Sequence, residues 1–315
     1  RRVADAIGMP HYVLDYESRF RDAVMDDFAD SYLRGETPIP CVRCNQSVKF
    51  RDLMATARDL GAEALVTGHY IRRLVGAAGP ELHRARDAAK DQSYFLFATT
   101  PAQLEFLRFP LGGLEKTETR RHAERLALPV AAKPESQDIC FVPDGDYARV
   151  VERLRPGACD AGDIVHVDGR VLGRHDGIIN FTVGQRKGLG VSIGEPLFVS
   201  RIEPDSRRVV VGPLTTLARP GLTVRDVNWL GDGDLAIGDT RKVTVKIRST
   251  APAVAATLRG LGGGHAAIDF DEPQTGVAAG QACVFYDGSR VLGGGWIARQ
   301  EAAATDDGAR VALAG

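Results

Sequence analysis

The stretch KFRDLMATARDLGAEALVTGHY, residues 49–70, indicates how the amino-terminal part of the chain folds. Residues 49–63 have the apolar spacing of an amphipathic helix, which Gly61 brings to an end. Residues 64–70 follow as an apolar run of strand length that includes Gly68 near its end. A helix that leads directly into a strand of this kind is typical of an α/β fold.

The residues before this stretch predict a further strand and helix. HYVLDY, residues 11–16, predicts a short strand, and residues 17–34 predict a helix. The side chains that this helix should turn inward are Phe20, Val24, Phe28 and Leu33. Strand, helix and strand with short connections predict a parallel sheet covered by helices. Because ligands bind beyond the carboxyl ends of such strands, Gly68 and His69 are expected at the edge of a site.

The rest of the chain changes from helical to strand patterns. Two further helices are predicted near residues 101–108 and 117–126. From about residue 150, short strands alternate with Asp-Gly and glycine-rich turns, and from about residue 219 a second set predicts a small barrel. The segments read as strands are DIVHVDGRVLGRHDG, INFTVGQRKGLGV, PLFVSRIEPDSRRVVVG, KVTVKIRS, VAATLRG, HAAIDFD, QACVFYDG and RVLGGGWIA. Residues 300–315 are expected to form a disordered tail.

The composition is that of a globular protein. The 315 residues are 44% hydrophobic and 26% charged, enough for two or three domains. No apolar run is long enough to cross a bilayer, and RRVADAIGMP at the start has no apolar signal region, so we expect a cytoplasmic protein. This start reads as the second half of a helix that Gly8 ends, so we also expect an amino-terminal segment to be missing.

Charge and cysteine content narrow the functional classes. The net charge of -1 predicts no overall attraction to nucleic acid, so any RNA binding must come from local basic patches. Five cysteines, odd in number and unevenly spaced, argue against a secreted disulfide framework. Of these, Cys159 and Cys283 are predicted to be small buried residues.

TPIPCVRCNQSVKF, residues 37–50, raises the question of what Cys41 and Cys44 do. A structural zinc site usually has four ligands, often two CxxC pairs, and here there is one pair. A redox pair is a second interpretation, because the motif lies near a strand and a helix. A third is that both cysteines meet Cys140, which lies in the irregular segment 133–147. The spacing alone leaves these interpretations open.

Polar and basic segments are the candidates for binding. In KDQSYFL, residues 90–96, Asp91 is suited to cap a helix, whereas Lys90 could meet a phosphate and Gln92 a base edge.

Two further segments carry positive charge. GQRKGLG, residues 184–190, is either an exposed hairpin loop or a flexible basic loop against a phosphate backbone. In KVTVKIRS, residues 242–249, strand alternation turns Lys242, Lys246 and Arg248 to the outer face, which is either solvated or available to RNA.

Taken in order, these motifs add up to a family. They closely resemble the bacterial tRNA-specific 2-thiouridylases of the MnmA/TrmU type, over nearly the whole chain to about residue 298. The matching stretches are TPIPCVRCNQSVKF, ALVTGHY, KDQSYFL, ESQDICF, FTVGQRKGLGV and VFYDGSRVLGGGWI. The resemblance implies a PP-loop ATP-pyrophosphatase domain with a Rossmann-like parallel sheet (residues 1–148), a small central domain (149–218) and a tRNA-binding β-barrel (219–299).

The resemblance also implies a reaction and its residues. The family replaces O2 of uridine 34, at the tRNA wobble position, with sulfur: ATP adenylates the oxygen and a cysteine persulfide supplies the sulfur. Cys140 matches the persulfide carrier and Cys44 the nucleophile, and the two form a transient disulfide. Gly68 matches a backbone contact to ATP. The residues that match tRNA contacts are Ile39, Pro40, Cys41, Lys90, Asp91, Gln92, Arg248 and Ser249.

The sequence departs from the family pattern in three places. The SGGxDS loop that binds the ATP phosphates is not among the printed residues, Ile39 stands where asparagine is usual, and Ser249 replaces a frequent aromatic. One alternative is a tRNA-binding remnant without catalysis. Another is an iron–sulfur-dependent tRNA thiolase, in which Cys41, Cys44 and Cys140 hold a [4Fe–4S] cluster.

The implied cofactors and partners follow from the family. ATP is expected with Mg²⁺, and the substrates are expected to be the tRNAs for Lys, Glu and Gln. The sulfur donor is expected to be a sulfur-relay protein or a cysteine desulfurase. We expect a monomer with no membrane partner.

Overall fold

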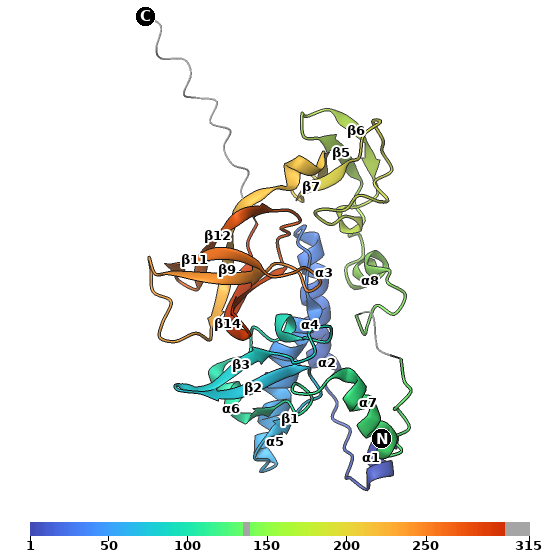
Figure 1. Cartoon of the computed structure of the whole chain (residues 1–315). Helices are drawn as coiled ribbons and strands as arrows, with labels where there is room; N and C mark the ends of the chain where they lie inside the picture. Colours follow the sequence, from blue (N-terminus) through green and yellow to red (C-terminus); the bar gives the residue numbers. More distant parts are fainter. Residues whose placement is uncertain (135–138, 300–315) are drawn as a thin grey trace, which may run out of the picture.

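The computed structural model describes residues 1–134 and 139–299. A helical amino-terminal body, a small central sheet and a β-barrel lie around the long helix α3 (Figure 1). None of the helices in the described part has the length and apolarity that crossing a membrane requires. The amino-terminal body contains α1 (Arg2–Ile7), α2 (Glu17–Phe20), η1 (Arg21–Met25), α3 (Asp26–Leu33), α4 (Pro40–Arg43), η2 (Cys44–Leu53), α5 (Met54–Asp59), β1 (Leu65–Val66), β2 (Ile71–Gly76), β3 (Gly79–Arg84), η3 (Ser93–Phe95), α6 (Pro101–Phe106), β4 (Leu107–Arg108) and α7 (Lys116–Arg125).

The predicted parallel α/β arrangement is present, in a short form. β1 and β4 pair in parallel, with Leu65 opposite Leu107 and Val66 opposite Arg108. The expected strand over residues 11–16 is wrong, because these residues form no strand and expose Tyr12 and Val13. An extended apolar segment becomes a strand only where a neighbouring strand takes up its backbone hydrogen bonds.

The two long helices differ in how well their limits were predicted. Residues 17–33 form the expected helix through α2, η1 and α3, and Val24 and Phe28 are buried as expected. The next helix was expected to begin at residue 49, which is wrong: α4, η2 and α5 run continuously from Pro40 to Asp59. Pro40 occupies the first turn, where proline is favoured because its missing N–H has no helical partner there. Cys41 and Cys44 therefore lie on a helix and not in a loop.

Five strands of the carboxyl-terminal barrel agree with the expected strand set, whereas β9 was not expected. The six barrel strands follow the order β13-β10-β11-β12-β9-β14, and β13 also pairs with β14, which closes the sheet. Val243, Val245 and Ile247 are buried inside, as the alternation of residues 242–249 predicted. The strands are β9 (Arg219–Trp229), β10 (Thr240–Lys246), β11 (Val254–Gly262), β12 (His265–Gln274), β13 (Ala282–Asp287) and β14 (Arg290–Ile297).

A hairpin that the sequence patterns did not indicate ties the amino-terminal body to the barrel. β2 and β3 pair with each other over their full length. β3 then joins β14 through one pair, Arg290 opposite His83. The barrel sheet therefore continues from β14 into β3 and β2, the strands that follow β1 (Figure 1).

The central domain is a four-stranded sheet in the order β6-β5-β8-β7, in which β5 and β8 are parallel. The expected strand in INFTVGQRKGLGV is wrong, because η4 and a series of turns occupy it. Gly184 donates its N–H to the carbonyl of Val199, and Gly188 has φ of 73°. The backbone of this segment therefore forms turns and does not pair as a strand. The elements are α8 (Tyr147–Leu154), β5 (Gly162–His166), β6 (Val171–His175), η4 (Ile178–Asn180), β7 (Phe198–Glu203), β8 (Arg208–Gly212) and η5 (Leu214–Leu217).

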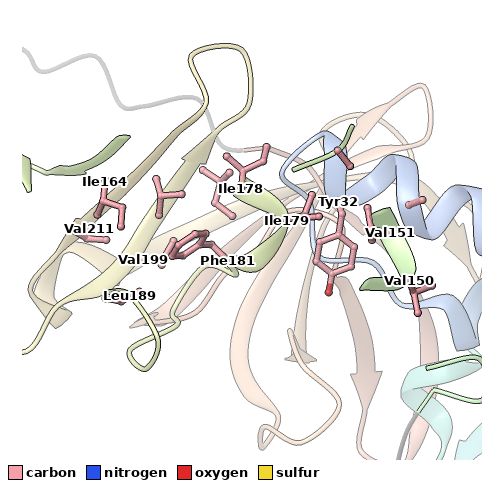
Figure 2. Packing of buried hydrophobic residues seen from close by; sticks show 14 of the residues in the cluster. Tyr32, Val150, Val151, Ile164, Ile178, Ile179, Phe181, Leu189, Val199 and Val211 are labelled. Carbon is pink, nitrogen blue, oxygen red and sulfur yellow. The ribbon is translucent and has the colours of Figure 1, made fainter. Parts of the chain in front are cut away.

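The hydrophobic core shared by α3, α8 and the central domain fixes these bodies against each other. Figure 2 shows Tyr32 of α3 between Ile179 of η4 and Val151 of α8. On the outer side, Arg155 donates to Asp26 and Asp30 of α3, both at 2.7 Å. This core places the chain between residues 139 and 147 beside α2 and α3.

The two cysteines that were predicted to be buried differ. Cys283, on β13, is buried in the barrel, as predicted. Cys159 is exposed, so its prediction is wrong. It lies in the turn after α8, where its N–H donates to the Glu152 carboxylate at 3.1 Å, and a turn at that point leaves the thiol outside the core.

Candidate active site around Cys44 and Cys140

A cavity of about 270 Å³ brings the three candidate cysteines together. Its walls come from the helix after Pro40, the helix η1 with the end of α2, the turn after β1, the start of η3 and the segment around residue 140. The lining residues are Phe20, Val24, Pro40, Cys41, Cys44, Asn45, Lys49, His69, Gln92, Phe95, Ile139, Cys140 and Phe141. The cavity lies at the carboxyl end of β1, where a parallel sheet places its ligands.

Buried polar contacts hold the helix that carries Cys44. Asn45 is 4% exposed, and its Nδ2 donates to the carbonyl of Phe95 at 3.2 Å. Lys49 Nζ donates to Asn45 Oδ1 at 3.1 Å. The amide of Asn45 therefore bridges the helix to the KDQSYFL segment and also holds the ammonium group of Lys49 at the cavity.

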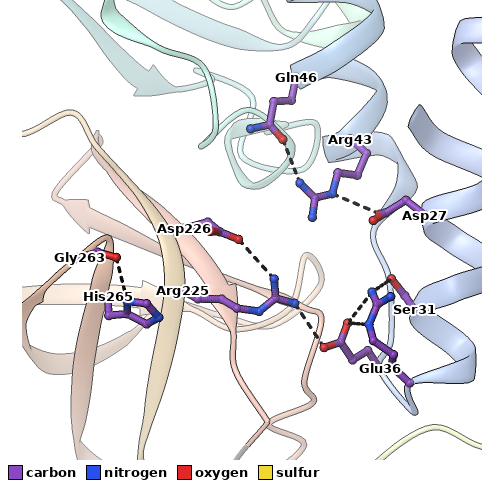
Figure 3. Close-up of polar contacts among 10 residues, drawn as sticks. Asp27, Ser31, Glu36, Arg43, Gln46, Arg225, Asp226, Gly263 and His265 are labelled. Atoms are coloured by element: carbon purple, nitrogen blue, oxygen red, sulfur yellow. Dashed lines mark hydrogen bonds and ion pairs between the residues drawn. The ribbon is translucent and has the colours of Figure 1, made fainter. Parts of the chain in front are cut away.

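The neighbouring residue, Arg43, fixes the same turn of helix against α3 and the barrel. Its Nε donates to Asp27 at 3.2 Å and its Nη1 to Gln46 at 3.4 Å (Figure 3). Its guanidinium also stacks 4.3 Å from the centroid of Trp296 on β14. A planar, multidentate side chain of this kind restricts both position and rotation of the helix.

A second polar link joins the start of this helix to the barrel. Glu36 accepts from Arg225 of β9 at 3.3 Å (Figure 3). It also accepts from Arg34 at 3.1 Å. Arg34 also donates to Ser31 at 3.0 Å, which ties the link back to α3.

Aromatic packing holds the opposite wall. The ring of Phe141 lies edge-on to Phe28 at 5.2 Å and to Phe20 at 5.8 Å between centroids. Val142 is buried and donates its N–H to the carbonyl of Ile139 at 2.9 Å. Cys140 itself is exposed, so this segment presents its thiol at the mouth of the cavity.

The cavity sets the protonation of the two thiols on the helix. Burial raises the pKa of Cys44, Lys49 lowers it in part, and Cys140 raises it further. Burial also raises the pKa of Cys41, with contributions in the same direction from Cys140 and Cys44. Both thiols therefore ionise less readily than a cysteine in water.

His69 is uncharged in this cavity. Burial lowers its pKa to about 4, and Lys49 acts in the same direction. Its Nδ1 lies 2.7 Å from Thr67 Oγ1. A neutral imidazole can donate or accept a proton through the nitrogen that does not face Thr67.

The residues proposed to meet ATP and the KDQ segment lie next to this cavity. Gly68 is exposed and lies two residues after β1, directly before His69. Gln92 Oε1 accepts the N–H of Tyr70 at 2.8 Å, so its side chain also braces the turn after β1. Asp91 accepts from the N–H groups of Ala85 and Ser93, a structural capping role. Lys90 is half-buried.

The other proposed RNA contacts are scattered. Pro40 lines the cavity, whereas Ile39, 7% exposed, packs into the core. On the barrel, Arg248 is exposed and donates to the carbonyl of Thr275 at 3.4 Å. The carbonyl of Ser249 accepts from Lys246 Nζ at 2.9 Å.

Lys246 differs from its neighbours on β10. It is half-buried, and burial lowers its pKa while Asp91 opposes that shift. The expected outer row of three cations is therefore split, with Lys242 and Arg248 exposed.

A metal site needs several ligands in one place. Among the residues that the structure describes, no group of three or more His, Cys, Asp or Glu side chains is placed to hold a metal ion. Cys41, Cys44 and Cys140 share a cavity, and no step is derived through a cluster.

Sequence patterns did not indicate that Asn45 and Lys49 line the cavity. Both follow Cys41 at helical spacing, four and eight residues on, and the signal was hidden because the helix was expected to begin only at residue 49. Phe141 was also missed, since nothing near residue 140 indicates that its ring would meet α2 and α3.

Comparisons with known proteins cover most of the chain. Residues 1–144 match the family model described as tRNA methyl transferase HUP domain, residues 150–213 the PRC-barrel domain and residues 219–297 the aminomethyltransferase beta-barrel domain.

Curated relatives match along nearly the full chain. The tRNA-specific 2-thiouridylase MnmA of Rhodospirillum centenum is 66% identical, over 96% of this chain and 78% of its own length. The proteins of the same name from Hyphomonas neptunium and Rickettsia bellii are 62% and 57% identical, over 95% of this chain and 77% and 81% of their own lengths. The chain therefore belongs to the tRNA-specific 2-thiouridylase (MnmA) family.

Proposed function

We propose that the protein is an ATP-dependent sulfurtransferase that converts uridine 34 of tRNA to 2-thiouridine. The observation that carries the proposal is the shared cavity of Cys44 and Cys140, which reach it from a helix and from a turn segment. Family membership supplies the reaction class, and the two thiols supply the groups that sulfur transfer needs.

The proposed chemistry divides one difficult substitution into steps. The O2 atom of uridine is a poor leaving group, so ATP transfers its AMP group to that oxygen and pyrophosphate leaves. The terminal sulfur of a persulfide on Cys140 then attacks C2, and AMP departs with the oxygen. The product of this step is a disulfide between Cys140 and the base.

Cys44 completes the transfer. Its thiolate attacks Sγ of Cys140, the bond from Cys140 to the sulfur on the base breaks, and the electron pair stays with the sulfur on C2. This releases 2-thiouridine and leaves a Cys44–Cys140 disulfide. An external thiol reductant must supply two electrons and two protons before the next cycle, and a persulfide-bearing donor protein must reload Cys140.

The binding of ATP and tRNA is proposed from the surroundings of the cavity. Gly68 lies exposed at the end of β1, so its backbone is open to ATP, which we propose binds with Mg²⁺. A Cβ on Gly184 would lie 3.8 Å from Gly276, so the GQRKGLG loop is next to the loop that Arg248 contacts. Exposed Arg186 and Lys187 then extend the positive surface of Arg248 across two domains. The proposed substrates are the tRNAs for Lys, Glu and Gln.

Nucleoside analysis tests the proposal. Deleting the complete gene should remove 2-thiouridine derivatives from these tRNAs, and the intact gene should restore them. A deletion strain with normal levels of wobble 2-thiouridine would overturn it.

A further inference from the structure

Lys49 is unusual among the residues that line the cavity. It is the one Lys or Arg side chain in the described part of the lining, and His69 is neutral there. The other titratable groups that face Cys44 are Cys41 on the same helix, His69 after β1 and Cys140 on the opposite wall.

The helix holds this cation in place. Lys49 is five residues after Cys44 within η2, and the wider i→i+5 winding of a π-helix brings such residues toward one face. Its Nζ donates to Asn45 Oδ1, and Asn45 is fixed in turn by the carbonyl of Phe95. A chain of two hydrogen bonds therefore keeps a flexible side chain directed at the cavity.

We infer that Lys49 is a positioning residue for sulfur transfer, whose ammonium group stabilises the thiolate that Cys44 forms when it attacks. The inference rests on the proposed role of Cys44 as the attacking thiol. Burial and the neighbouring sulfur of Cys140 oppose ionisation of Cys44, and Lys49 is the group that counters them. A persulfide anion on Cys140 would add negative charge, which makes the cation more important during turnover.

Alkylation of Cys44 measures this effect without requiring turnover. Only the thiolate reacts with iodoacetamide, so the rate against pH, followed by peptide mass spectrometry, gives the apparent pKa of Cys44. Lys49→Met should raise that pKa by about one unit and slow alkylation at neutral pH about tenfold. Lys49→Arg, which keeps the charge, should react within about twofold of the wild-type protein.

Arg51→Met is the matched control. It removes one cation from the same helix, but Arg51 is exposed, pairs with Asp52 at 2.9 Å and does not line the cavity, so Cys44 should titrate as in the wild type. If Lys49→Met is unstable, Lys49→Gln, which retains a hydrogen-bond donor to Asn45, replaces it with the same expected shift.

The outcomes separate this inference from the proposed function. An unchanged Cys44 titration in folded Lys49→Met or Lys49→Gln would overturn the role of Lys49, even if the protein thiolates tRNA. A raised pKa in these variants, restored by Lys49→Arg, would support it, even if no 2-thiouridine were formed.

Discussion

The walls of the cavity present Cys44 and Cys140 on supports of different kinds. Cys44 lies on a helix whose side chains are tied by polar contacts, with Asn45 reaching Phe95 and Arg43 reaching α3 and the barrel. Cys140 lies on a turn segment that is held chiefly by the ring of Phe141 and by Val142.

The difference matches the two tasks proposed for these thiols. A thiol that must receive sulfur from another protein needs access, and Cys140 is exposed at the cavity mouth. A thiol that must attack in one direction benefits from a fixed position, which the helix provides for Cys44. Segments with few buried side chains open at lower free energy than anchored helices, so the carrier side is the one suited to movement.

The largest effect should come from removing either thiol. Cys44→Ser and Cys140→Ser should each abolish 2-thiouridine formation by the full-length protein, because a hydroxyl neither carries a persulfide nor attacks a disulfide. Cys159→Ser makes the same atomic change on an exposed turn and should retain activity. Mass spectrometry of tRNA nucleosides measures all three. Normal thiolation by either site variant would contradict the proposed division of labour.

A smaller effect should follow from loosening one support. Phe141→Ala removes the ring contacts to Phe20 and Phe28, so Cys140 should lose its position, and the rate of thiolation should fall by about 10- to 100-fold. Phe141→Leu keeps much of the packing and should recover most of the rate.

The alkylation rate of Cys44 distinguishes the two walls. It should be nearly unchanged in Phe141→Ala, because the helix has its own anchors. If Cys44 slows as much as sulfur transfer does, the two supports are not independent.

Only some of the elements that form these supports could be predicted from the sequence. Residues 17–33 and the barrel strands other than β9 were predictable because apolar side chains repeat at helix or strand spacing and are buried accordingly. The roles of Cys44 and Cys140 followed from family resemblance, and no periodicity points to them. The ESQDICF motif is only partly visible, since residues 135–138 lie outside the described residues, as does the expected tail after 299.

What could not be predicted depends on contacts between distant segments. The helix start at Pro40 was missed because the following CVRCNQS segment has little apolar spacing. The docking of the β2–β3 hairpin on the barrel was missed because it depends on one pair between distant residues, Arg290 opposite His83. The placement of Lys49 depends on Asn45 reaching a carbonyl that no local pattern reveals.

A modest effect is expected at Arg248 and Lys246, on the barrel face that we propose binds tRNA, away from both walls. Arg248→Ala removes one exposed cation and should reduce the slope of log K for tRNA binding against log salt by about one. Lys246→Ala should change the slope less, because Lys246 is half-buried and donates within the barrel. Filter binding at several salt concentrations measures both. Equal slopes for Arg248→Ala and the wild type would show that this face is only solvated.

The smallest effect is expected at Cys41, which shares the cavity but has no assigned step. Cys41→Asp should retain thiolation within about threefold, because Cys44 and Cys140 suffice for the proposed transfer. Thiolation, iron and sulfide are measured for the wild-type protein and for Cys41→Asp, each purified with and without oxygen. Protein that is brown and rich in iron and sulfide without oxygen, and that loses colour and activity in Cys41→Asp, would favour the cluster alternative.

The most direct test of the account is to identify the disulfide left after one turnover. The full-length protein, with Cys140 loaded with persulfide, is mixed with ATP and unmodified tRNA in the absence of reductant, then alkylated, digested and mapped by mass spectrometry. The account predicts one new disulfide, Cys44–Cys140, formed in proportion to 2-thiouridine and absent when ATP is omitted. Thiolated tRNA accompanied by a Cys41–Cys44 disulfide, or by no disulfide at all, would contradict it.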